Sequence, residues 1–191
     1  MLEELREELV RRGQHERLPE VLRTIRERAE HLEQFISGYA TFAKLPAPRP
    51  EPVAWEAFLG SLSLHAAFRV AGPLPKEQAS FDRTQMEQAL LNLLKNAHES
   101  GTQPEEVSIA VRRTAEGVAV EVTDRGTGMS EAVFANALVP FYSTKRSGTG
   151  LGLALTREIV EAHGGRIAIH NRPGGGIAVT LYLPGDVTGR T

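Results

Sequence analysis

Four prolines within residues 45–52, LPAPRPEP, divide this chain of 191 residues into two parts. Proline fixes φ and has no backbone N–H, so neither a helix nor a central strand can run through this segment. We expect residues 1–45 and 53–184 to fold as separate units, joined by a stiff and extended linker over 46–52. Residues 185–191 are expected to form a loose tail.

The part before the prolines has a helical period. Between residues 16 and 44, apolar residues recur at alternating spacings of four and three, as at the a and d positions of a coiled coil. A shorter helix is expected over 2–11, ended by Gly13. The seam of the longer helix consists of Leu18, Leu22, Ile25, Ala29, Leu32, Ile36, Tyr39 and Ala43.

This pattern predicts a helical hairpin that forms a homodimer through its seam. A helix that packs on its own domain is the alternative. Because the second arm is much longer than the first, much of its seam would find no partner in a hairpin. We therefore expect the first helix to continue upstream of residue 1.

The part after the prolines alternates helices with short apolar strands. Helices are expected over 55–62, 83–100 and 150–163, and residues 129–148 are expected to be irregular. Strands that pair in hairpins, with helices between them, favour an α+β fold: a two-layer α/β sandwich with a mixed sheet and helices on one face. One strand is expected to end near Asp82. Four others are expected over 106–114, 117–124, 166–171 and 177–184.

Composition excludes several classes of protein. The chain has no cysteine, which rules out disulfides and thiolate metal sites. Its net charge of -2 gives no footprint for nucleic acid, and no apolar run is long enough to be a membrane segment. The charged N-terminus does not resemble a secretion signal, so we expect a cytoplasmic location, with a membrane tether of the full-length protein left open.

A glycine-rich stretch, GTGLGL, begins at Gly148 and leads into the last expected helix. It matches neither the GxxxxGK[ST] loop nor the GxGxxG fingerprint of dinucleotide-binding proteins. Free amides at the start of a helix, together with the helix dipole, suit an anion such as phosphate. A plain loop at the entry to a helix is the alternative.

Two further polar patterns flank this stretch in the sequence. Asn92 and Asn96 share one face of a leucine-rich helix, where their amide oxygens could bind a hard cation that already carries phosphates. Asp124 ends a strand and could accept a hydrogen bond from an exocyclic amine, with Gly126 and Gly128 allowing a planar ring to approach. Exposed asparagines and an ordinary Asp-x-Gly turn are the respective alternatives.

In this order and spacing, these motifs resemble the catalytic and ATP-binding domain of sensor histidine kinases, within the wider group of gyrase, Hsp90 and MutL ATPases. The resemblance covers about residues 53–184 and implies the Bergerat ATP-binding fold. The hairpin and FAKLPAPRPEP further resemble a truncated dimerisation domain of the nitrogen-regulation type. The matching motifs are the N box from Asn92 to Ala97, the first glycine box from Asp124 to Met129, the F box from Pro140 to Lys145 and the second glycine box from Gly148 to Leu153.

The resemblance implies ATP and Mg²⁺ as cofactors. Asp124 would hold the adenine amine, Asn92 and Asn96 would bind Mg²⁺, and Asn92 and Lys145 would take part in catalysis. A mobile lid, residues 141–147, would cover the phosphates. The other implied ATP-binding residues are Lys95, Gly126, Gly128, Phe141, Thr144, Gly148, Thr149, Gly150, Leu151 and Gly152.

The sequence departs from the family pattern at two places. Glu99-Ser100 follows the N box, where many of these kinases have Lys-Tyr. This leaves Lys145 as the side-chain cation nearest the terminal phosphate, helped by Lys95 or Arg146. Position 92 is asparagine where gyrase-like ATPases have a general-base glutamate, so we expect transfer to another nucleophile rather than strong hydrolysis.

The expected nucleophile is a histidine on the dimerisation helix, from which a response-regulator receiver domain would take the phosphoryl group. His15 lies in the expected turn and His31 on the second helix, both away from the acceptor position. We therefore expect the acceptor upstream of residue 1, and a chain that binds ATP without phosphorylating itself. A serine kinase of the anti-sigma type and a non-enzymatic scaffold are the alternatives.

Overall fold

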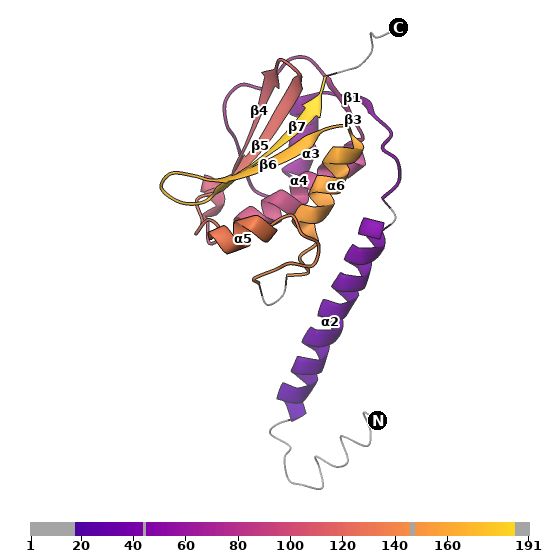
Figure 1. Cartoon of the computed structure of the whole chain (residues 1–191), viewed down its shortest axis with the longest axis vertical. Coiled ribbons are helices and arrows are strands. Elements are labelled where there is room, and N and C mark those ends of the chain that lie inside the picture. The colour runs from indigo at the N-terminus through magenta and orange to yellow at the C-terminus, as the bar shows by residue number, and fades with distance from the viewer. Residues whose placement is uncertain (1–17, 44, 146–147, 186–191) are drawn as a thin grey trace. The chain divides into compact units, whose positions relative to one another are not determined.

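The computed structural model describes residues 18–43, 45–145 and 148–185 (Figure 1). Contacts divide the chain into two compact units, Met1–Ala43 and Lys44–Thr191. None of the helices described is long and apolar enough to cross a membrane. The expectations for the helix over 2–11, for Gly13 and His15, for Arg146 and for the tail after Gly185 fall outside the described residues.

The described part of the first unit is a long helix, α2 (Leu18–Ala43), as the heptad pattern predicts. Four apolar residues of the predicted seam are among the exposed large side chains: Leu22, Ile25, Leu32 and Ile36. An amphipathic helix normally buries such a stripe. The seam therefore has apolar area available for a partner.

The second unit is built on a five-stranded sheet with the order β2-β4-β5-β7-β6. β2 pairs in parallel with β4, and the other pairs are antiparallel, so the sheet is mixed, as predicted. A second, two-stranded sheet pairs β1 with β3. The strands are β1 (Glu51–Val53), β2 (Arg69–Val70), β3 (Ala79–Phe81), β4 (Ser108–Thr114), β5 (Gly117–Thr123), β6 (Arg166–Asn171) and β7 (Ile177–Pro184).

Three helices form the second layer: α3 (Trp55–Leu62), α4 (Arg83–His98) and α6 (Gly152–Ala162). α4 packs beside α6 and on β5, while α6 also packs on β6 and β7 (Figure 1). The core between the layers includes Leu90, Leu94, Ile109, Val120, Ile159 and Leu181, all fully buried. The prediction of a two-layer sandwich with a mixed sheet is confirmed.

One α-helix of the described residues was not predicted. α5 (Glu131–Asn136) lies within the stretch expected to be irregular. Ser130 caps it, because its Oγ accepts a hydrogen bond from the N–H of Val133 at 3.4 Å. The Ser130-Glu131 pair is a start signal for a helix, but the helix has only six residues and no apolar period to support the signal.

The proline segment is attached to the start of α4. Nε2 of Gln85 donates to the carbonyl of Pro46 at 2.9 Å, and the N–H of Arg49 donates to Asp82 Oδ2 at 2.9 Å. Asp82 also caps α4, since its Oδ1 accepts from the N–H of Gln85 at 3.0 Å. One side chain therefore joins the helix start to the chain that enters the unit.

Candidate nucleotide-binding site

The site begins on α4. Asn92, Asn96 and Glu99 occur at i, i+4 and i+7, so they follow one stripe of the helix. On the core side, Leu90, Leu93, Leu94 and Ala97 are buried. Packing of the leucines therefore fixes the direction in which the polar stripe faces.

The N-terminus of α6 lies against this stripe. A Cβ added to Gly152 would sit 3.8 Å from Nδ2 of Asn96 and 3.9 Å from Cγ of Asn92. Nδ2 of Asn92 is buried and has no hydrogen-bond partner among the described residues. A buried amide without a partner is costly unless a ligand satisfies it. The structure thus brings together the N box and the second glycine box, 60 residues apart at Asn92 and Gly152.

Asp124 lies at the end of β5 and is only 2% exposed. Its Oδ1 atom lies within hydrogen-bond distance of four donors: the backbone N–H groups of Gly126 (2.8 Å) and Ile177 (3.3 Å) and the hydroxyls of Ser100 (3.3 Å) and Thr102 (3.5 Å). All four contacts are made to Oδ1 and none of them to Oδ2. One carboxylate oxygen is therefore held by the protein, while the other, which has no hydrogen bond from the described residues, could accept one from a ligand.

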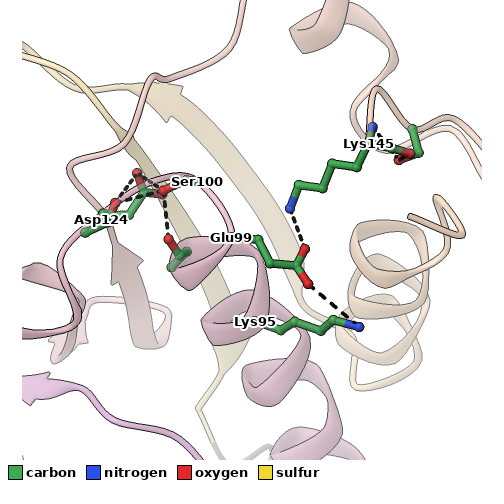
Figure 2. Close-up of polar contacts among 8 residues, drawn as sticks. Lys95, Glu99, Ser100, Asp124 and Lys145 are labelled. Atoms are coloured by element: carbon green, nitrogen blue, oxygen red, sulfur yellow. Dashed lines mark hydrogen bonds and ion pairs between the residues drawn. The ribbon is translucent and has the colours of Figure 1, made fainter. Parts of the chain in front are cut away.

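Ser100 joins the end of α4 to the first glycine box (Figure 2). A Cβ at Gly126 would lie 2.1 Å from Ser100 Oγ and 2.5 Å from the Ser100 carbonyl oxygen, so only glycine fits there. Thr102 continues the connection, since its Oγ1 contacts Ser100 Oγ at 2.7 Å and accepts from the N–H of Arg125 at 3.0 Å. Ser100 and Thr102 are buried or half-buried polar residues that the motif analysis did not assign to the site.

The turn between β6 and β7 supports the same segment from the other side. Arg172 Nη1 donates to the carbonyl of Asp124 at 2.5 Å. Asn171 pairs its side-chain amide with the backbone of Met129, with both hydrogen bonds at 2.8 Å. No motif in the sequence indicates this support, because Asn171 and Arg172 are about 45 residues beyond the box that they hold.

The F box meets the second glycine box through the backbone. The N–H of Phe141 donates to the carbonyl of Gly150 at 3.0 Å. Phe141 has a φ of 67°, a left-handed conformation that costs a non-glycine residue about 1–3 kcal/mol. Gly150 has a φ of 69°, and a Cβ there would lie 2.5 Å from the Phe141 carbonyl carbon.

Other predicted site residues surround this contact. Leu151 is buried and precedes α6 as its cap, and its N–H faces Thr149 Oγ1 at 3.4 Å. Gly148 donates its N–H to the carbonyl of Lys145 at 3.2 Å. Thr144 is exposed.

Lys145 has a partner that the motif analysis did not predict. Its Nζ lies 2.7 Å from Oε2 of Glu99, and Lys95 Nζ lies 3.9 Å from the other carboxylate oxygen (Figure 2). The three side chains are partly exposed, at 39% for Lys145, 42% for Glu99 and 70% for Lys95. Both lysines expected to contact phosphate are therefore next to one carboxylate.

The sequence model of a protein family described as histidine kinase-, DNA gyrase B- and HSP90-like ATPases matches residues 81–187, more than half of the chain. The chain belongs to this family. Its second unit, Lys44–Thr191, is accordingly an ATP-binding ATPase unit, and the site is formed by residues within the matched range.

Similar proteins are named as sensor kinases. The chain is 38% identical over 128 residues to the sensor histidine kinase ZraS of Escherichia coli, covering 67% of this chain and 27% of ZraS. It is 29% identical over 178 residues to the nitrogen regulation protein NtrY of Azorhizobium caulinodans, covering 85% of this chain and 23% of NtrY. The chain thus spans about a quarter of the length of these relatives.

Solved structures agree with the fold. The catalytic domain of the histidine kinase ThkA in a nucleotide-free form superposes with a TM-score of 0.64 at 25% identity, covering 72% of this chain and 96% of that domain. Full-length ShkA in complex with AMPPNP superposes with a TM-score of 0.68 at 25% identity, covering 87% of this chain and 38% of ShkA. The ATPase unit has the Bergerat fold of the histidine kinases, as the resemblance implies.

Proposed function

We propose that this chain is the ATP-binding catalytic part of a two-component sensor histidine kinase. It would promote transfer of the γ-phosphoryl group of ATP to a histidine on a dimerisation helix. The observation that carries the proposal is the position of the α6 N-terminus beside the asparagine pair, where a Cβ at Gly152 would lie 3.8 Å from Asn96 and 3.9 Å from Asn92. Helix amides and side-chain amides there converge on one place that suits a polyphosphate.

Different residues would bind the adenine base and the phosphates. Asp124 Oδ2 would accept from the adenine amine, and the backbone of Gly126 and Gly128 would lie beside the base. The orphaned amide of Asn92 and the free N–H groups at the start of α6 would donate to phosphate oxygens.

The fit to Mg²⁺ rests on the same two asparagines. Oδ1 atoms of Asn92 and Asn96 would complete the coordination of Mg²⁺ carried by the triphosphate, in keeping with the oxygen ligands that this cation prefers. Bound there, the cation would neutralise phosphate charge. Lys145 would contact the terminal phosphate, and the described residues of the predicted lid, Phe141–Lys145, would cover it.

The catalytic work of these residues is positioning and charge stabilisation, which dominate phosphoryl transfer. Position 92 carries an amide, which cannot act as a general base to activate water. An imidazole nitrogen is itself a nucleophile, so transfer to histidine needs no such base. Two histidines of the ATPase unit already have structural contacts: His98 Nε2 lies 2.8 Å from the Ala67 carbonyl, and both ring nitrogens of His163 are engaged.

Partners follow from this role. A response-regulator receiver domain would take the phosphoryl group from histidine, and a second copy of the chain would pair through α2. We place this part of the protein in the cytoplasm, where ATP and receiver domains occur. Sensor kinases among the relatives support these assignments.

The test mixes the chain with γ-labelled ATP and Mg²⁺, with and without a second polypeptide that carries a histidine-bearing dimerisation helix of this kinase type. We expect acid-labile, base-stable label on the second polypeptide only. Acid-stable label on serine would support the serine-kinase alternative. ATP binding without any transfer would support a scaffold, and acid-labile label on this chain alone would place the acceptor within it.

A further inference from the structure

Glu99 is a carboxylate in a place that disfavours one. It is the C-cap residue of α4, where the helix dipole already presents partial negative charge. It also lies on the stripe with Asn92 and Asn96, next to the proposed position of a strongly anionic triphosphate. Nearby cations must offset both effects.

The offsetting cations are the two lysines. Lys145 Nζ contacts one oxygen of Glu99 at 2.7 Å, the length of a charge-assisted hydrogen bond, and Lys95 approaches the other oxygen at 3.9 Å. Lys145 belongs to the F box and Glu99 caps the C-terminus of α4, 46 residues earlier. The ion pair therefore connects the segment that would cover the phosphates to the helix beneath them.

We propose that Glu99 sets the affinity and the phosphate specificity of the site by competing with the nucleotide for Lys145. In the empty site the carboxylate holds the ammonium group. When a triphosphate binds, a phosphate oxygen takes over as the partner of Lys145, and Glu99 keeps only the weaker contact with Lys95. After the terminal phosphoryl group has left, the smaller charge of the diphosphate competes less well, and Lys145 returns to Glu99.

This inference rests on the proposed function, because it needs Lys145 as a phosphate contact. It adds Glu99 to the site and predicts the direction in which triphosphate affinity changes when its carboxylate is removed. Removing the competitor should tighten triphosphate binding, whereas a carboxylate that merely holds Lys145 in place should weaken it when removed. Because both side chains are partly exposed, the effect should be modest, about two- to fivefold.

The test measures the affinities of ATP, ADP and adenosine by calorimetry for the whole chain, Glu99→Gln, Lys145→Met and the double variant. Glu116→Gln is the matched control: it removes the same charge from an exposed residue at the β4–β5 turn, at the other end of β5 from Asp124. Circular dichroism checks the fold of each variant.

We expect Glu99→Gln to raise ATP affinity two- to fivefold, ADP affinity less, and adenosine affinity not at all, with Glu116→Gln unchanged for all three. In the Lys145→Met background the gain from Glu99→Gln should disappear. Equal or weaker ATP binding by Glu99→Gln overturns the inference, and so does an undiminished gain without Lys145. If the unaltered chain binds and transfers phosphate while Glu99→Gln behaves like it, only this inference fails; if the unaltered chain does not bind ATP, the proposed function fails as well.

Discussion

At the residue scale, Asp124 is defined by the asymmetry of its two oxygens. Four donors surround Oδ1, so in Asp124→Asn the amide oxygen should take that position and the NH₂ group should replace Oδ2. A donor would then face the adenine amine, leaving two donors opposed. We expect ATP affinity to fall about 10- to 100-fold, as a lost buried hydrogen bond to a charged group implies.

The same variant should bind a 6-oxo purine nucleotide relatively better, since its carbonyl accepts from the new NH₂ group. Calorimetry with ATP and inosine triphosphate measures the ratio of the two affinities. An unchanged ratio, with both affinities reduced together, would mean that Asp124 supports the fold of the site without contacting the base.

Two glycines of the second glycine box should respond differently to alanine. Gly152 has room for a Cβ, at 3.8 Å or more from its neighbours, so Gly152→Ala should leave the free energy of unfolding unchanged or raise it by up to about 1 kcal/mol. The added methyl group would still stand beside Asn92 and Asn96 and hinder the phosphates, and we expect ATP affinity to fall at least tenfold. Urea unfolding and ATP titration of one preparation separate the two effects.

Gly150→Ala is the contrasting variant. Its Cβ would lie 2.5 Å from backbone carbon at a positive φ, so it should lower the free energy of unfolding by about 1–3 kcal/mol. If Gly152→Ala is the more destabilising of the two, the packing of α6 against α4 differs from the one described.

At the element scale, the start of α4 depends on one carboxylate. Burial raises the pKa of Asp82, but hydrogen bonds from backbone N–H groups, those of Arg49 and Gln85 first, outweigh it and hold the pKa below its ordinary value. A lowered pKa means that the ionised form stabilises the fold. That contribution is complete above the unfolded-state pKa, near 4, and is lost as the pH falls through the folded-state pKa.

We therefore expect Asp82→Asn, which keeps a capping oxygen, to lower the free energy of unfolding by about 0.3–1 kcal/mol at pH 7. The difference from the unaltered chain should shrink as the pH falls below about 4. Urea titrations at a series of pH values measure it. A difference that stays constant down to pH 3 would show that the charge of Asp82 does not act on stability.

The elements that the sequence predicts are those in which an apolar pattern repeats several times or a proline or glycine marks a boundary. The leucines of α4, the alternation in β4 and β5 and the seam of α2 each repeat often enough to identify the element. α5 and the two-residue strand β2 are too short to repeat, so tertiary contacts decide them. At the site, the boxes predict the residues that we propose to contact the nucleotide, while Ser100, Thr102 and Asn171 act through contacts between distant segments that no local pattern encodes.

At the scale of the whole molecule, the chain consists of a helical unit, Met1–Ala43, and an ATPase unit, Lys44–Thr191. The two units offer different surfaces to a partner or ligand. The ATPase unit contains all the described residues assigned to ATP. The helical unit supplies an apolar seam in which Leu32 and Ile36 are each 57% exposed. The proposed transfer of phosphate to a dimerisation helix requires that seam to meet a partner, whereas the ATP site does not include it, so dimerisation and ATP binding should be separable by mutation.

Two substitutions on α2 should separate dimerisation from ATP binding. In a homodimer through α2, each Leu32 or Ile36 buried at the seam contributes about 1.5–3 kcal/mol per copy, so Leu32→Glu with Ile36→Glu should weaken the dimer by several orders of magnitude. Light scattering should report a dimer for the unaltered chain and a monomer for the double variant, with equal ATP affinity. Thr24→Glu, at a heptad position outside the seam, should remain dimeric. A monomer for the unaltered chain at high concentration would contradict dimerisation through α2, and a loss of ATP affinity in the double variant would mean that the ATPase unit depends on the helix.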